Sequence, residues 1–245
     1  MSNRALAILA LALFSLTVLA RAPARWLVAF APKSIECQLP AGSVWQGECA
    51  RLRAPGLELT ALGWKLHPWS LLRGRLELEV HSGDPRAPGA ATIAAGFGSS
   101  LSVRNLRADL PVDSGFLPLF PAGWSGQLQL ALDMVEFKGG RLSALRGTVA
   151  ANSLKQKNPA MPFGSYALQF AGAAGPGAAI VGTLRDTGGP LAVTGTLTIR
   201  SGHDYELEGL AAARPEATPE LAKAVEFLGP ADPQGRRAYS LAGTF

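Results

Sequence analysis

The stretch Asp186-Thr-Gly-Gly-Pro-Leu-Ala-Val-Thr-Gly-Thr-Leu-Thr-Ile-Arg200 indicates which kind of fold this chain adopts. It opens with a Gly-Gly-Pro turn, after which apolar and polar residues alternate. The larger apolar side chains of the run share one face: Leu191, Val193, Leu197 and Ile199. Alternation with a period of two predicts a β-strand that buries one face and exposes the other to water.

The C-terminal block, residues Asp186–Phe245, contains further predicted elements after this strand. A second strand is predicted from Tyr205 to Ala213, and a short helix over Pro219–Leu228. Thr218 is suited to cap that helix, and Gly229 begins the Gly-Pro pair that ends it. A final strand ends on Phe245, which we expect to be its last core residue.

Similar alternation occurs earlier in the chain. Arg75–Val80 and Gln127–Leu132 each place their large apolar residues on one face, and in Leu101–Leu106 the phase slips by one residue, as a β-bulge would cause. The chain is therefore predicted to be mainly β, with one antiparallel sheet and few short helices in a single domain over residues 34–245. A sheet this long must curl, close or fold over itself to hide its apolar face.

An apolar run of sixteen residues, Ala5–Ala20, lies near the N-terminus. A bilayer span needs about 20 residues and a signal-peptide core about 7–15, so the run fits either a membrane anchor or a cleaved signal. A cut after Ala22 would leave Pro23 at the new terminus, which favours an uncleaved transmembrane helix. Three residues would then sit at the membrane interface: Arg21, Arg25 and Trp26.

The positive charge is concentrated before the predicted domain. The chain carries 23 Lys and Arg against 18 Asp and Glu, a formal net charge of +5. Residues 1–33, the predicted cytoplasmic tail, anchor and juxtamembrane segment, contain four basic residues and no acidic one, which leaves a net charge of +1 for residues 34–245. A nucleic-acid-binding domain concentrates positive charge on its folded part, so this class of function is excluded.

The chain has two cysteines, Cys37 and Cys49, which are twelve residues apart and flank a turn at Leu39-Pro-Ala-Gly42. A hairpin there would bring the two thiols within bonding range, and an exported domain would keep the disulfide oxidised. The sequence therefore predicts a disulfide, and two unrelated buried thiols are the alternative.

Motifs for catalysis are missing from the sequence. It contains no Gly-x-Ser-x-Gly, no P-loop, no His-Glu-x-x-His and no Cys-x-x-Cys. The three histidines, His67, His81 and His203, are scattered and have no evident nucleophile or metal partner. We therefore expect a protein that is not an enzyme and that has no cofactor, metal or catalytic residue.

Several short segments, taken in order, carry a resemblance to a known family. They are Gly42-Ser-Val-Trp45-Gln-Gly47, Leu62-Gly-Trp64-Lys-Leu66-His-Pro68-Trp-Ser-Leu71-Leu72-Arg-Gly74-Arg-Leu76, Gly164-Ser-Tyr166-Ala-Leu168, Gly188-Gly189-Pro190-Leu191, Gly195-Thr-Leu197 and Leu228-Gly229. Together they resemble the N protein of the bacterial type II secretion system over nearly the whole chain.

The resemblance implies an accessory inner-membrane subunit with one membrane anchor and a β-rich domain in the periplasm. Its partners would be other type II secretion subunits in the inner membrane and the periplasm, and no catalytic residue carries over from the family. Trp64–Leu76 is also similar, less specifically, to membrane-anchored, groove-like β proteins that handle envelope lipids. A lipid ligand is therefore the alternative function.

Three tryptophans lie in the segments that carry the resemblance: Trp45, Trp64 and Trp69. Indole rings are the largest packing units available, so we expect these three to fill the core. In the alternative, some of them line a groove or a partner surface.

Overall fold

The computed structural model describes residues 3–29, 35–54, 57–96, 99–113, 123–158, 160–172, 177–200 and 204–244. Within these ranges the helices are α1 (Asn3–Ala20), α2 (Ala24–Ala29), α3 (Pro68–Leu71) and α4 (Pro219–Glu226). The strands are β1 (Glu36–Gly42), β2 (Gln46–Ala54), β3 (Leu57–Leu66), β4 (Arg75–Ser82), β5 (Gly89–Gly96), β6 (Ser100–Pro111), β7 (Trp124–Lys138), β8 (Arg141–Gln156), β9 (Met161–Ala171), β10 (Ile180–Gly188), β11 (Leu191–Arg200), β12 (Asp204–Ala213) and β13 (Arg237–Thr244).

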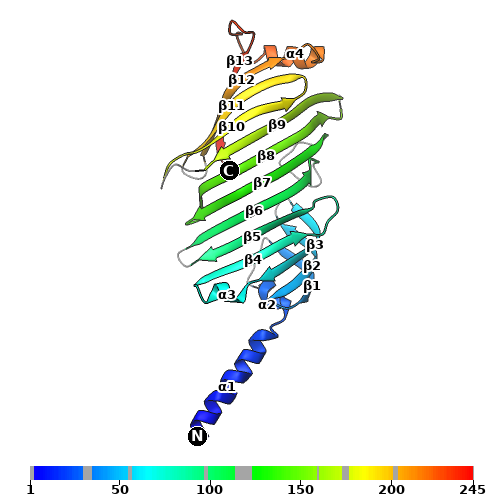
Figure 1. Cartoon of the computed structure of the whole chain (residues 1–245). Helices are drawn as coiled ribbons and strands as arrows, with labels where there is room; N and C mark the ends of the chain where they lie inside the picture. The colour runs from blue at the N-terminus through cyan, green and yellow to red at the C-terminus, as the bar shows by residue number, and fades with distance from the viewer. Residues whose placement is uncertain are drawn as a thin grey trace.

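All thirteen strands belong to one sheet and pair in the order of the sequence, from β1 to β13 (Figure 1). Every neighbouring pair is antiparallel. The predicted mainly β fold, one antiparallel sheet with few short helices, is confirmed. The sheet is open, with β1 at one end and β13 at the other.

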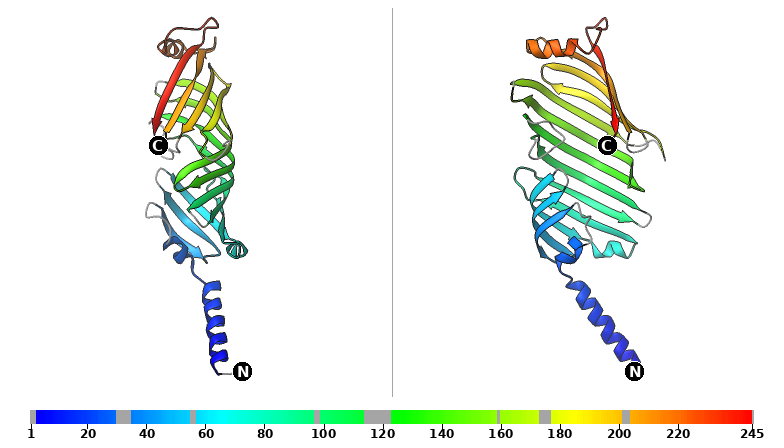
Figure 2. Two further views of the ribbon diagram at one scale, coloured as in Figure 1. Left: turned by 90° about the vertical axis from the view of Figure 1, so that its left-hand side faces the viewer. Right: turned by 180° about the vertical axis from the view of Figure 1, so that it is seen from behind.

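The N-terminal end of the sheet bends out of the plane of its long strands (Figure 2). β3 pairs with β4 only from Leu62 onward, so the first half of β3 separates from β4 while it stays paired with β2. Leu59 in that half shares an apolar cluster with Ala87, in the turn before β5, and with Leu110 of β6. The sheet is therefore folded over at this end, and β2 and β3 approach strands that are not their neighbours.

A β-bulge accounts for the phase slip in the sequence of β6. Asn105 has a φ of 51°, and the pairing of β5 with β6 shifts between Ala90 and Thr92. The pairing of β7 with β8 also shifts, between Leu132 and Met134. The bulge predicted within Leu101–Leu106 is confirmed, and such irregularities increase the bend and twist of the strands that contain them.

One face of the sheet is apolar along most of its length. A row of directly paired residues crosses it from β6 to β10: Ala108, Leu130, Val149, Leu168 and Leu184. The members of this row are half-buried, whereas Leu132 and Phe170 beside it are buried in a cluster with Ile180 and Ile199. The sheet thus covers part of its own apolar face by bending and leaves the rest shallowly exposed.

The C-terminal block folds as its sequence predicts. β11 and β12 form a hairpin, and β13 adds to the outer side of β12. The backbone N–H of Leu221 donates to Thr218 Oγ1 at 3.3 Å, which confirms the cap of α4. Leu221 and Val225 then pack against Leu191. Phe245, predicted as the last core residue, lies outside the described residues.

Helix α1 projects away from the folded-over end of the sheet (Figures 1 and 2). Large apolar side chains of α1 are exposed: Leu6, Leu11, Leu13, Phe14, Val18 and Leu19. None of the helices in the described ranges combines the length and the hydropathy needed to cross a membrane. The structure therefore does not confirm the predicted transmembrane helix.

Candidate functional site

Cys37 of β1 and Cys49 of β2 form a disulfide, with their Cα atoms 5.7 Å apart. The predicted bond is confirmed, and it joins the two strands of the first hairpin. Cys49 is buried in an apolar cluster with Trp64 of β3 and Ala24 of α2. The disulfide therefore fixes the end of the sheet at the place where the N-terminal segment meets it.

Hydrogen bonds attach the N-terminal segment to the β1–β2 turn. The backbone N–H of Val44 donates to the carbonyl of Ala22 at 2.9 Å, and the indole N–H of Trp45 donates to the carbonyl of Leu19 at 2.9 Å. The three residues predicted to lie at a membrane interface are all exposed or partly exposed here: Arg21, Arg25 and Trp26. Their position beside α1 is compatible with that prediction, which no contact in the structure tests.

The three tryptophans predicted to fill the core behave differently. Trp64 is buried in the cluster beside the disulfide, as predicted. Trp45 is half-buried in the β1–β2 turn. Trp69 is 78% exposed, so its assignment to the core is wrong. The reason is that the chain leaves β3 at Leu66 and turns into α3, which carries Trp69 away from the packed face.

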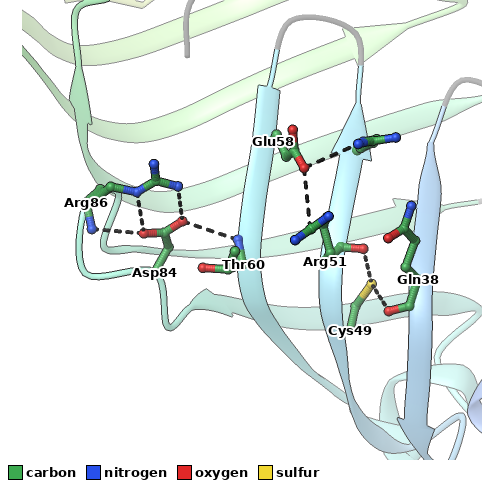
Figure 3. Close-up of polar contacts among 8 residues, drawn as sticks. Gln38, Cys49, Arg51, Glu58, Thr60, Asp84 and Arg86 are labelled. Atoms are coloured by element: carbon green, nitrogen blue, oxygen red, sulfur yellow. Dashed lines mark hydrogen bonds and ion pairs between the residues drawn. The ribbon is translucent and has the colours of Figure 1, made fainter. Parts of the chain in front are cut away.

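Asp84 holds the folded-over end of the sheet (Figure 3). Its carboxylate accepts hydrogen bonds from the Arg86 backbone N–H at 2.9 Å and from the Thr60 N–H at 3.3 Å, and it pairs with the Arg86 guanidinium at 3.3 Å. The bonds from Arg86 hold the pKa of the Asp84 carboxyl far below its usual range, and they outweigh the opposing effect of burial. A buried charge with this many donors is stabilising only as a complete set.

A second ion pair, partly buried, closes the turn between β10 and β11. Arg214 donates to Asp186 Oδ2 at 2.5 Å and to the carbonyl of Gly189 at 2.7 Å, while the Val193 N–H donates to Asp186 Oδ1 at 3.0 Å. Burial alone would raise the pKa of Asp186. The hydrogen bonds from Arg214 and Val193 lower this pKa by more than burial raises it, so the net shift is downward. Burial, followed by the nearby Asp186 charge, raises the pKa of Tyr166 to about 12.

The two edges of the sheet differ in how well they are protected. Helix α2 packs against β1, which is otherwise exposed, and Pro40 within that strand has no N–H to donate to an incoming strand. β13 pairs with β12 along its whole length and contains no proline. Ser240, Leu241 and Ala242 of β13 are exposed. β13 is therefore the edge better suited to accept another strand.

An apolar trough of about 270 Å³ lies under the folded-over end. Its walls come from strands β3 to β7 and from the turn before β5. Residues that line it include Leu57, Leu59, Ala87, Leu106, Leu110 and Leu130. The half-buried row that crosses the sheet begins in this trough, since Ala108 and Leu130 belong to both.

The described ranges contain no group of three or more His, Cys, Asp or Glu side chains that could hold a metal ion. His67 follows β3 and lies 2.9 Å from Glu79, and His81 lies in β4. His203 is outside the described residues.

Sequence reasoning did not single out Asp84, Arg214 or the exposure of Trp69. A signal for Asp84 was present, because an Asp between Gly83 and Pro85 is a frequent turn-forming residue whose side chain accepts from backbone N–H groups nearby. No local signal pointed to Arg214, since its partner lies 28 residues earlier in the chain.

Comparison with known proteins shows which family the chain resembles. The family model for the type II secretion system (T2SS), protein N, matches residues 33–240. The chain is similar to the type II secretion system protein N of Aeromonas hydrophila, with 27% identity over 84% of this chain and 82% of that protein. It is also similar to the protein of the same name from Vibrio cholerae serotype O1, with 27% identity over 57% of this chain and 58% of that protein. No solved structure matches the chain significantly.

Proposed function

Because the chain belongs to the type II secretion system protein N family, we propose that it is an accessory inner-membrane subunit of the type II apparatus. Family membership gives it a role in type II protein secretion, as a structural component in the cell envelope rather than an enzyme. The finer proposal is that its sheet contacts other subunits in the periplasm and thereby supports export of folded proteins across the outer membrane.

The observation that carries this proposal is the difference between the two sheet edges. β1 contacts α2 and contains Pro40, which has no N–H to donate, whereas β13 contains no proline and pairs with β12 over its whole length. An exposed edge can take up an extended strand from a partner, with backbone hydrogen bonds supplying affinity and side-chain pockets supplying specificity. We therefore assign β13 as the contact surface for another subunit of the apparatus.

Residues 1–33 are proposed as a short cytoplasmic tail, a single membrane anchor and a juxtamembrane segment, and residues 34–245 as the periplasmic domain. Exposed leucines on the projecting helix α1 support the anchor. The disulfide supports the periplasmic location, because such bonds persist in oxidising compartments. Membrane fractionation with protease added to spheroplasts tests the topology. Protection of the C-terminal domain from the protease would contradict it.

Deletion of the gene and complementation test the secretory role. We expect the deletion strain to retain secreted enzymes, folded, in the periplasm and the natural chain to restore their release. Normal secretion by the deletion strain, in a system shown to need its other subunits, would overturn the role.

The contact surface needs its own variant. Lysines at an edge oppose strand addition, so S240K/A242K is expected to fail in complementation. The chain itself should remain folded, because these positions face Glu208 and Glu206 across the β12–β13 ladder. Q127K/Q129K, which places the same charges on exposed positions of the central strand β7, is the control and should complement. Equal complementation by both variants would rule out β13 as the contact.

The apolar trough favours a second candidate function, the handling of envelope lipids. The trough continues into a half-buried apolar row that reaches β10, which gives an acyl chain a surface to follow. Lipid extraction and native mass spectrometry of the full chain test this function. One lipid per chain, lost in L110N/L130N and kept in L241N outside the trough, would support it. Lipid-free protein that still restores secretion would contradict it.

A further inference from the structure

The short helix α3 and the turn after it form an exposed apolar knob. Trp69 is 78% exposed, Leu72 is 79% exposed, and Leu71 between them is 43% exposed. Side chains of this size are seldom left in water together, and an exposed apolar cluster commonly marks a protein or membrane contact. The knob is therefore a candidate contact surface for a protein or a membrane.

Local hydrogen bonds hold the knob in one shape. Ser70 Oγ donates to the carbonyl of His67 at 2.6 Å, and the Gly74 N–H donates to the carbonyl of Leu71 at 3.0 Å. Gly74 has a φ of 68°, a conformation that glycine adopts without a steric penalty, and it returns the chain to β4. Trp69 and Leu72 are thus kept on the outside by the backbone.

The knob lies at the end of the sheet from which α1 projects (Figure 1). Backbone contacts establish the same proximity. Ala22, just after α1, accepts from Val44, and the next residue, Trp45, accepts from the N–H of Leu66 at 2.7 Å. One residue later, His67 precedes α3. The knob and the N-terminal segment are therefore held by the same corner of the sheet.

Charge distinguishes the knob from other exposed apolar positions. Arg73 and Arg75 are exposed, and the sequence has no acidic residue between Glu58 and Glu77. At the opposite end of the sheet Phe227 is 82% exposed, but it follows directly on Glu226. Tryptophan is enriched at membrane interfaces, where its indole lies in the headgroup layer, and arginine near the surface is attracted to anionic lipid.

We propose that the knob, residues Pro68–Arg75, rests on an anionic phospholipid surface. Trp69 and Leu72 insert at headgroup depth, and Arg73 and Arg75 bind lipid phosphates. This second contact would fix the tilt of the sheet relative to the bilayer, which a single helical anchor leaves free. The contact with anionic lipid is argued from the knob itself. Only the identity of the membrane, the inner membrane, rests on the proposed function, in which residues 1–33 attach the chain to it.

Fluorescence of the full chain in vesicles with brominated lipids tests the contact. The difference in fluorescence between the natural chain and W69F gives the signal of Trp69. The difference between F227W and the natural chain gives the signal of a tryptophan at the opposite end of the sheet, which is the matched control. We expect bromine near the headgroups to quench the Trp69 component more strongly when phosphatidylglycerol is present, and to leave the F227W component unchanged. Each arginine removed in R73Q/R75Q should weaken the contact equilibrium about fivefold.

Vesicle flotation separates this proposal from that of the anchor. A chain that floats with the vesicles while its Trp69 component stays unquenched would retain the anchor and overturn the knob contact. A chain that does not float would overturn both. Quenching that is independent of anionic lipid and of both arginines would overturn the recognition of lipid charge. Crosslinking of the knob to another envelope protein, with no quenching, would assign it to a protein partner instead.

Discussion

The backbone N–H of Thr60 donates to Asp84 Oδ2 at 3.3 Å at the point where β3 leaves β4. One step earlier the Gly83 N–H still donates to the carbonyl of Ala61, at 2.8 Å. The Asp84 carboxylate thus extends the ladder by one bond after the two strands have separated. It also ties the turn before β5 to the folded-over end, where Ala87 packs against Leu59.

Replacement of Asp84 by asparagine should lower the free energy of unfolding by about 1–3 kcal/mol, because Arg86 and the Thr60 N–H lose the charged acceptor that this buried carboxylate provides. Urea unfolding followed by circular dichroism measures the change. D133N is the matched control, since Asp133 pairs with Arg107 at 2.6 Å with both side chains about half exposed. Exposed pairs contribute at most about 1 kcal/mol, so an equal loss in both variants would contradict the role of Asp84.

Asp84 should also make stability depend on acid pH. The pKa of Asp84 is lower in the folded than in the unfolded chain, so its contribution is present above the unfolded value near 3.8 and is lost as pH falls toward the folded value. D84N should therefore show a flatter fall in stability between about pH 4 and pH 2. Urea midpoints measured across that range check the slope. Parallel curves for the two chains would refute the assignment.

Tyr166 should make stability depend on alkaline pH. Its pKa is raised from 10.0 to about 12 by burial, so the stability it gives is complete below pH 10 and is lost as pH rises through about 12. Burial also raises the pKa of Tyr239, so absorbance titration should show a late-ionising fraction that decreases, without disappearing, in Y166F. The variant should also lose stability at neutral pH, because the Tyr166 hydroxyl donates to the carbonyl of Phe163. An unchanged titration curve would count against the burial.

Loss of the disulfide should destabilise the chain by about 3 kcal/mol, the value expected for closing a short loop. C37S/C49S measures this by denaturant unfolding, and reduced natural protein is the control, which should match the variant. The cysteines are only twelve residues apart, so the effect should be concentrated on the first hairpin and the N-terminal segment packed on it. Hydrogen exchange would locate the change, and uniform loss of protection across β6–β13 would disagree with it.

The two tryptophans Trp64 and Trp69 form a matched pair for packing. Trp64 is 5% exposed and Trp69 is 78% exposed. W64A should cost about 3–5 kcal/mol of unfolding free energy, and W69A less than about 0.5 kcal/mol. Denaturant midpoints of the two variants compare them directly. A large loss in W69A would show that the knob packs against the domain.

Alternation was sufficient to predict strands wherever each strand has one dry and one wet face, as in Arg75–Val80 and Leu191–Arg200. The α4 helix was also predictable, since Thr218 and Gly229 mark its ends locally. The disulfide followed from the short hairpin between Cys37 and Cys49. In these cases the information lies within about ten residues of the feature itself.

Other features depend on how distant segments approach, and the sequence alone did not predict them. Trp64 and Trp69 look alike in the sequence, and only the direction in which the chain leaves β3 makes one a core residue and the other a surface residue. Asp186 meets Arg214 through the register of β10, β11 and β12. The trough likewise exists only because the first half of β3 crosses over β5 to β7.

The consecutive order of the strands has a consequence for how the chain reaches its fold. No strand has to wait for a segment made much later, because each one pairs with the strand before it and the strand after it. Such a low contact order favours fast folding. A chain delivered N-terminus first could add strands one at a time to a growing edge, starting from a hairpin closed by Cys37 and Cys49. Among the described strands, β13 would then be the last to join the sheet, so its outer edge would be the last to form.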